Sequence, residues 1–258
     1  MPIKLLSAGT FLCLVVYAVG AVALYAYQRK ILYFPSLEYA HEFDSLELYN
    51  EQEVLKVAVL NPGQSRAIIY FGGNAEAVIF NAEPFLENFP EHTIYLVNYR
   101  GYGGSTGSPT ELGLYSDSLA LYDRVSTSYE SISLMGRSLG SGVATFLASQ
   151  REVAHLALIT PYDSIKNVAQ ARIPIYPAGL LLKDRYDSAE KAKSVAARVL
   201  IVMAELDSVI PNSHSIKLSE AFQEEQVSII NIKGADHNNI SLDLEYYSSL
   251  KRFFGSQL

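Results

Sequence analysis

Short apolar runs recur along the chain from residue 67 onward, and longer amphipathic segments separate them. The runs are four to six residues long and rich in Ile, Val, Leu or Tyr: 67–71, 94–98, 132–135, 155–160, 199–204 and 227–232. Continuous short apolar runs are typical of strands that are buried on both faces of a parallel sheet. Val54, Val57 and Val59 indicate one further strand before this series.

Segments of helical periodicity lie between these runs, at 76–89, 111–129, 139–150, 213–222 and 241–254. Strands that alternate with helices form right-handed βαβ units within one sheet. The pattern therefore predicts an α/β fold with a doubly wound, mostly parallel sheet and helices on both faces. No internal repeat divides residues 31–258, so we expect one domain there.

The segment 161–193 breaks this rhythm. It contains Pro161, Pro174 and Pro177 and the apolar run 178–182. A long excursion between two strands of an α/β sheet is typical of a small cap over the strand ends, where ligands bind. We therefore expect 161–193 to be a cap segment within the domain.

Residues 5–27 are 23 consecutive uncharged positions. A helix of that length crosses about 30 Å of hydrocarbon. Tyr25 and Tyr27 fall where an interfacial aromatic belt is expected, and Arg29 and Lys30 follow them. We therefore expect residues 1–30 to be a single-pass membrane anchor. The alternative is a cleaved signal peptide, whose apolar core usually runs about 7–15 residues.

Positive charges flank the anchor on both sides, with Lys4 and the α-amino group before it and Arg29 and Lys30 after it. The positive-inside rule therefore leaves the orientation open. An N-in anchor places residues 31–258 outside the cytoplasm, which in a bacterium is the periplasmic side of the inner membrane.

Composition argues against several classes of function. The net charge is −7 and no run of Lys or Arg is present, so we expect no nucleic-acid partner. Cys13 is the sole cysteine, which rules out an intramolecular disulfide. No Cys/His cluster has zinc spacing and no G-x-x-x-x-G-K-[ST] phosphate loop occurs. The sequence therefore predicts neither a metal nor a cofactor.

Residues 136–140 read Gly-Arg-Ser-Leu-Gly and match the pattern G-x-S-x-G. They lie between an expected strand and an expected helix, and such a turn holds its serine in a strained backbone conformation with the side chain exposed. The N-terminus of the helix adds partial positive charge near a developing oxyanion. Ser138 is therefore the candidate nucleophile.

A serine hydroxyl needs a base and an acid that orients the base. In this motif the acid comes next along the chain and the histidine last. His237, in a turn-rich loop after the last expected strand, is favoured over His214, which falls in an expected helix. Asp207, after the strand 199–204, is the favoured acid. The alternatives for the acid are Glu205, Asp163 and, last, Asp236.

Two main-chain N–H groups are needed to face the developing negative charge. We expect one from Leu139 and the other from the loop after the strand 67–71. Gly72 and Gly73 permit a tight turn there, so Asn74 is expected to donate its main-chain N–H and Glu76 to open a helix.

Several motifs occur in one order over nearly the whole chain. They are Tyr-Phe-Pro at 33–35, Gly-Asn-Ala at 73–75, Asn-Tyr-Arg-Gly-Tyr-Gly-Gly-Ser at 98–105, Gly-Ser-Pro-Thr-Glu at 107–111, Gly-Leu-Tyr at 113–115, Gly-Arg-Ser-Leu-Gly-Ser-Gly at 136–142, Pro-Tyr-Asp-Ser-Ile at 161–165, Asp-Ser-Val-Ile-Pro at 207–211 and Asp-His-Asn-Asn at 236–239. With them the chain resembles the α/β-hydrolase superfamily. More narrowly, it resembles the membrane-anchored serine hydrolases with one N-terminal span, a group that includes eukaryotic protein depalmitoylases.

The resemblance implies a triad of Ser138, Asp207 and His237 and an oxyanion contact from Asn74. Two motifs depart from the family. Its usual His-Gly-Asn-Ala-Gly is Gly-Gly-Asn-Ala-Glu at 72–76, and its usual Gly-His-Asn-Asp is Asp-His-Asn-Asn at 236–239. The first departure leaves the shape of the oxyanion loop open.

The leading hypothesis is therefore a membrane-tethered hydrolase that cleaves carboxylic ester or thioester (acyl) bonds. The anchor and the apolar part of the cap, 173–182, favour a lipid-like or acylated substrate. The alternatives are a serine peptidase or amidase and a non-catalytic scaffold on the same fold.

Overall fold

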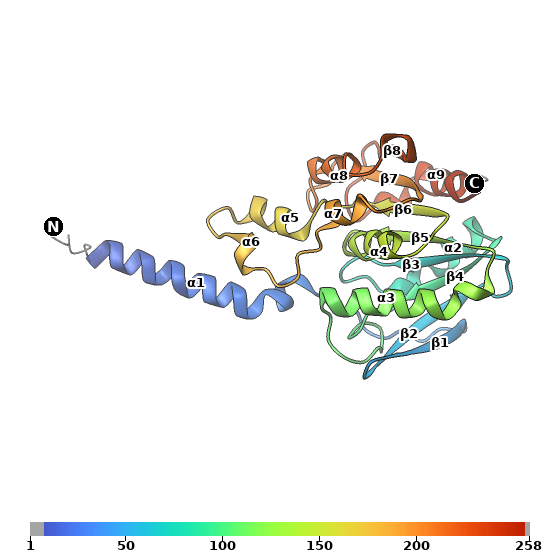
Figure 1. The fold of residues 1–258 in the computed structure, drawn as a ribbon, viewed down its shortest axis with the longest axis horizontal. Helices are drawn as coiled ribbons and strands as arrows, with labels where there is room; N and C mark the ends of the chain where they lie inside the picture. The colour runs from blue at the N-terminus through green and yellow to red at the C-terminus, as the bar shows by residue number, and fades with distance from the viewer. Residues whose placement is uncertain (1–7, 256–258) are drawn as a thin grey trace.

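The computed structural model describes residues 8–255, which contain one eight-stranded sheet flanked by helices (Figure 1). The strands are β1 (Asp44–Asn50), β2 (Glu53–Leu60), β3 (Arg66–Phe71), β4 (His92–Val97), β5 (Ser131–Arg137), β6 (His155–Ile159), β7 (Arg198–Ala204) and β8 (Val227–Ile232). Their order in the sheet is β1-β2-β4-β3-β5-β6-β7-β8. The β1–β2 and β2–β4 pairs are antiparallel and all the others are parallel. The predicted mostly parallel sheet is therefore confirmed.

Helices cover both faces of this sheet. The α-helices are α1 (Ala8–Leu32), α2 (Ala82–Asn88), α3 (Glu111–Val125), α4 (Leu139–Gln150), α5 (Ile165–Arg172), α6 (Ala178–Leu181), α7 (Ser188–Ala192), α8 (Asn212–Ser219) and α9 (Leu244–Gly255). Apolar side chains of α3, α4, α7 and α8 join the core on one face, and those of α2 and α9 join the core on the other. The sheet is therefore doubly wound, as the sequence predicts.

Two elements differ from the sequence expectation. The expected helix from Glu76 begins only at Ala82, after a turn and a 3₁₀ helix, η1 (Val78–Asn81). Pro84 explains the difference, because proline fits the first turn of a helix but disrupts its interior. Strand β1 was not predicted: most of its side chains are at least partly exposed, so it lacks the apolar run of a buried strand.

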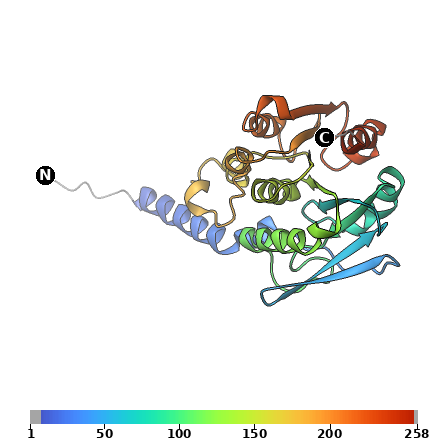
Figure 2. The ribbon, with the colours of Figure 1, turned by 45° about the vertical axis from the view of Figure 1, so that its right-hand side comes forward.

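Helix α1 extends away from the body of the molecule, beside the cap segment (Figures 1 and 2). It is long and apolar enough to cross a membrane, a test that signal sequences and core helices also pass. Residues 1–7 of the expected anchor, including Lys4, and residues 256–258 of the expected domain lie outside the described residues. The expected cap, 161–193, contains α5, α6 and α7.

Candidate active site

Ser138 lies in the turn between β5 and α4, at the carboxyl end of the parallel strands. Its backbone has φ 49° and ψ −116°, which is a strained conformation for a residue with a side chain. The turn is held because the Ser138 N–H donates to the Ile159 carbonyl at 2.9 Å. Gly140 is required here: a Cβ at this position would lie 2.0 Å from the Phe71 carbonyl oxygen. The sequence G-x-S-x-G thus forms the sharp turn that the motif predicts.

The three predicted triad residues meet at this turn. His237 Nε2 is 2.9 Å from Ser138 Oγ, and His237 Nδ1 is 2.8 Å from Asp207 Oδ2. The other oxygen of Asp207 accepts the main-chain N–H groups of Val209 and Ile210 at 2.9 and 2.7 Å. The Asp207 side chain is only 1% exposed. The carboxylate is therefore fixed from both sides, with one oxygen left for the imidazole.

The competing residues are engaged elsewhere. His214 Nδ1 pairs with Asp163 Oδ1 at 2.7 Å, so the alternative base and an alternative acid bind each other. Glu205 accepts the Gly234 N–H at 2.8 Å. Asp236 accepts the main-chain N–H groups of residues 238 and 239. None of these four side chains bonds to Ser138 or His237 among the hydrogen bonds of residues 8–255.

Asp163 is held as an anion in spite of its burial. Burial raises the pKa of its carboxyl group, but hydrogen bonds from Asn167 and His214 and the Lys217 ammonium outweigh that effect. The net result is a pKa below its usual value. Asp163 and Asn167 lie in the cap segment, whereas His214 and Lys217 lie on α8, so this cluster ties the cap to the main body.

The loop 72–77 lies against the turn that carries Ser138. A Cβ added to Gly73 would be 3.7 Å from Ser138 Cβ. Neither the Asn74 nor the Leu139 main-chain N–H donates any of the hydrogen bonds found among residues 8–255. The Asn74 side chain binds the end of α1 instead: its Oδ1 accepts the Phe34 N–H at 2.9 Å, and its Nδ2 donates to the Leu32 carbonyl at 2.6 Å.

Glu76 shapes this loop, and the sequence did not predict its role. Its carboxylate accepts the Gly73 N–H at 2.6 Å, the Tyr70 hydroxyl at 2.6 Å and the Asn81 side-chain amide at 2.7 Å. Burial raises the pKa of Tyr70 well above its usual value, and the negative charge of the nearby Glu76 carboxylate raises it further. The Tyr70 hydroxyl therefore stays protonated and acts as a donor. The signal was present as the departure at position 76, where the family usually has glycine.

Arg137 connects that loop with the loop that carries the histidine. Its Nη1 is 3.5 Å from Glu76 Oε2, and its Nη2 donates to the main-chain carbonyl of His237 at 3.0 Å. Arg137 thus joins the turn that carries Ser138 to the loop 72–77 and to the loop that carries His237.

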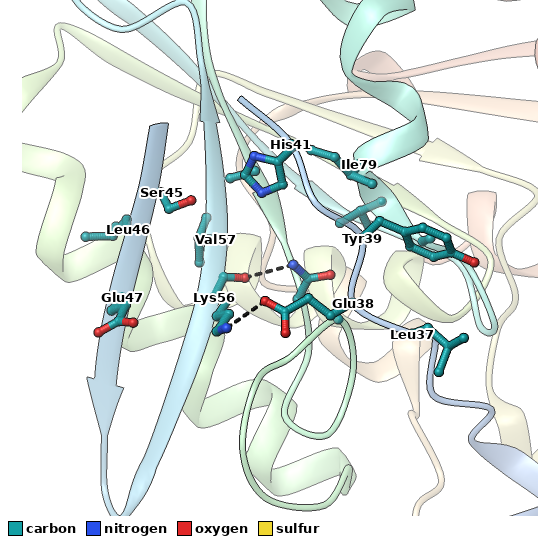
Figure 3. Close-up of a pocket in the computed structure, with 15 residues that line it drawn as sticks. Leu37, Glu38, Tyr39, His41, Ser45, Leu46, Glu47, Lys56, Val57 and Ile79 are labelled. Carbon is teal, nitrogen blue, oxygen red and sulfur yellow. Dashed lines mark hydrogen bonds and ion pairs between the residues drawn. The ribbon is translucent and has the colours of Figure 1, made fainter. Parts of the chain in front are cut away.

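The Arg100 guanidinium forms a buried ion pair with Asp117, at 2.6 Å. A cavity of about 230 Å³ lies between residues 37–41, the β1–β2 edge and Ile79 (Figure 3). The Lys56–Glu38 ion pair closes one side of it. Its lining includes none of the three triad residues, so it is separate from the site at Ser138.

Comparison with known proteins places this geometry in a family. A family model described as serine hydrolase (FSH1) matches residues 92–237, more than half of the chain. An uncharacterized protein of Mycobacterium tuberculosis is 30% identical over 235 residues, which cover 85% of this chain and 83% of that protein. Alpha/beta hydrolase domain-containing protein 17B from Homo sapiens is 32% identical over 171 residues, which cover 64% of this chain and 57% of that protein.

Solved structures show the same fold at low sequence identity. An esterase from Pyrococcus furiosus matches with a TM-score of 0.69 at 16% identity, over 86% of this chain and 98% of that chain. Est1E from Butyrivibrio proteoclasticus, solved with ferulic acid bound, matches with a TM-score of 0.66 at 17% identity, over 81% and 97%. The fold is therefore that of the α/β-hydrolases.

Proposed function

The chain belongs to the serine hydrolase (FSH1) family of α/β-hydrolases, and on that premise we propose that it is a membrane-tethered enzyme that cleaves carboxylic ester or thioester bonds with a triad of Ser138, His237 and Asp207. The observation that carries the proposal is the continuous chain of contacts from Ser138 Oγ through the imidazole to Asp207, at 2.9 and 2.8 Å. Both distances are within hydrogen-bond reach.

The chemistry follows from this geometry. With its Nδ1–H donated to Asp207, His237 has Nε2 free to accept the Ser138 proton as the serine oxygen attacks the acyl carbonyl. The main-chain N–H groups of Leu139 and Asn74 stabilise the resulting oxyanion. His237 then returns the proton to the leaving alcohol or thiol, and water releases the acyl group by the same steps.

The tether is supported by α1, whose large apolar side chains are mostly exposed. An exposed apolar helix of this length favours a bilayer around it. We place the catalytic domain at the membrane surface, outside the cytoplasm for an N-in helix, and we assign it acylated or lipid-like substrates. Retention of the N-terminal peptide in membrane fractions tests this against signal-peptide cleavage.

Hydrolysis of p-nitrophenyl esters and acyl thioesters by the full-length protein tests the catalytic assignment. Ser138→Ala should abolish both activities, whereas Ser228→Ala, at an exposed position of β8, should leave both unchanged. Equal activity of the wild type and Ser138→Ala would overturn the assignment. Cleavage of peptide amides in preference to both esters would instead favour a peptidase, and no turnover of any substrate would favour a scaffold.

A further inference from the structure

The end of α1 is bound to the cap segment by polar contacts. The buried Gln28 side chain donates to the Leu181 carbonyl at 3.0 Å and accepts the Lys183 N–H at 2.6 Å. Arg29, the next residue of α1, makes two hydrogen bonds to Asp184 through its guanidinium group, at 2.8 and 3.1 Å. These contacts hold the cap against the C-terminal end of α1.

A second contact lies much farther toward the N-terminus of α1. The Tyr17 ring stacks on Tyr176 with centroids 4.7 Å apart and an angle of 18°, and the Tyr17 hydroxyl donates to the Ile175 carbonyl at 2.9 Å. Gly20 makes room for this contact, because a Cβ there would lie 2.1 Å from the Tyr176 hydroxyl. The cap therefore contacts α1 from Tyr17 to Arg29, and Figures 1 and 2 show α6 beside α1.

The helix geometry gives the depth of this contact. Tyr17 precedes Tyr27 by ten residues, which corresponds to about 15 Å along a helix axis. That is about half of the roughly 30 Å hydrocarbon core. If α1 spans a bilayer with Tyr27 at the interface, Ile175 and Tyr176 lie well inside the hydrocarbon.

The segment 173–182 suits that environment. It has no charged residue, and Ile175 and Leu180 are 67% and 81% exposed. Backbone groups in lipid need internal partners. Hydrogen bonds are accepted by the carbonyls of Ile173, Pro174, Ile175, Pro177, Ala178 and Leu181. Pro174 and Pro177 have no N–H group that would need a partner.

Positively charged side chains lie near the segment 173–182, at the height of Tyr25 and Tyr27 along α1. The Lys183 ammonium lies 4.3 Å from the centre of the Tyr25 ring, and the Lys30 ammonium lies 5.7 Å from that of Tyr27. Arg185 is also exposed. Basic side chains beside aromatic rings are typical of the headgroup region, where anionic lipids attract them.

We infer that the cap segment 173–182 inserts into the same leaflet as the second half of α1, with Lys30, Lys183 and Arg185 among the lipid headgroups. The partner of this surface is the bilayer itself, and the substrate class is an ester or thioester whose acyl chain resides in that leaflet. The inference rests on the tether proposed above and deepens it.

The inserted surface connects directly to the catalytic loops. Arg172, at the end of α5, donates to the main-chain carbonyls of Ser208 and Val209 at 2.9 and 2.7 Å, next to the proposed acid. On the other side, the chain leaving α1 is bound by Asn74 through the Phe34 N–H. Both edges of the site are thus bound by residues that flank the two inserted elements, so an acyl chain reaches Ser138 from the bilayer.

Depth-dependent quenching tests the insertion with the full-length chain in phosphatidylcholine–phosphatidylglycerol vesicles. An environment-sensitive fluorophore is placed on the native Cys13 in α1 or, in a Cys13→Ser background, on Leu180→Cys or Thr127→Cys. Thr127 is exposed in η2 (Ser126–Ser128), before β5 and thus at the opposite end of the sheet. We expect blue-shifted emission and strong quenching by acyl-chain nitroxide lipids at positions 13 and 180, and neither effect at 127.

The outcomes separate the two proposals. Quenching at 13 but not at 180 would overturn the insertion of the cap and leave the tether intact. No quenching at 13 would overturn both. A label at 180 that is shielded from water but not quenched by nitroxide lipids would show that a second copy of the chain covers this face, which also overturns the inference.

Activity provides the second readout. Leu180→Glu should lower the hydrolysis of a long-chain acyl ester embedded in vesicles by roughly tenfold, because an acidic side chain enters hydrocarbon at a high cost. Its hydrolysis of water-soluble p-nitrophenyl acetate should not change. Ile229→Glu, at an exposed position of β8, is the matched control and should affect neither substrate. An equal loss on both substrates for Leu180→Glu would contradict delivery from the leaflet.

Discussion

The imidazole of His214 is paired with the Asp163 carboxylate at 2.7 Å, and both side chains are kept from the site at Ser138 by that contact. The pair joins α8 to the cap segment. A histidine and an aspartate also make up a catalytic dyad. Here, however, the Asp163 carboxylate is bound by Asn167 and Lys217 as well. This difference in partners gives the first prediction.

Asp163→Asn should destabilise the fold in a pH-dependent manner. The Asp163 side chain is fully buried and its pKa lies below the usual 3.8, so its stabilising effect is present at neutral pH and is lost as the pH falls through the lowered pKa. We expect a loss of about 2 kcal/mol in unfolding free energy at pH 7. Unfolding curves at a series of pH values should show the difference from wild type shrinking below pH 4. A difference independent of pH would contradict the assignment.

Asp207→Asn should affect catalysis and leave the stability of the cap unchanged. The asparagine keeps a similar shape but no longer holds the imidazole in the tautomer that accepts the serine proton, which costs about 10⁴-fold in kcat for this type of triad. Glu205→Gln, two residues earlier and exposed, should retain wild-type turnover. Steady-state kinetics with one ester substrate decides the matter, and comparable losses in both variants would count against Asp207 as the acid.

Glu76→Gln should lower kcat by roughly tenfold with little change in KM. Glu76 touches no reacting atom in the proposed mechanism, and it positions the loop 72–77, the proposed oxyanion loop, through Gly73 and Arg137. Interactions with the oxyanion exist mainly in the transition state, so their loss appears in kcat. Glu38→Gln removes an exposed ion pair with Lys56 and serves as the control. A rise in KM at constant kcat would mean that Glu76 acts on substrate binding.

Asn74→Ala should weaken the connection between α1 and the site. The alanine keeps the main-chain N–H but loses the hydrogen bonds to Phe34 and Leu32, worth about 1 kcal/mol each. We expect a lower thermal midpoint and a reduced kcat for esters. If Asn74→Ala retains full kcat, the loop does not depend on the end of α1 for its position.

The sequence predicted those parts of the fold that depend on local patterns. Six apolar runs became parallel strands, and the order of Ser138, Asp207 and His237 placed all three at strand ends, where they meet. Strand β1 was not predictable in this way, since an edge strand with polar side chains has no apolar run.

The remaining contacts depend on partners distant in the chain. Glu76 pairs with Arg137, 61 positions later in the sequence, and Gln28 binds the cap at Lys183, 155 positions later. Helical periodicity alone therefore put Glu76 in a helix, although its carboxylate folds the loop back onto Gly73. A charged residue in place of a family glycine was the sole sign of this arrangement.

The most direct test of the central claim is to map the site of covalent modification by a fluorophosphonate. The full-length protein is labelled in membranes, digested, and its peptides are identified by mass spectrometry. We predict a single adduct on Ser138, absent in Ser138→Ala and much slower to form in His237→Ala. An adduct on another serine, or equal labelling of the wild type and Ser138→Ala, would contradict the assignment of Ser138 as the nucleophile.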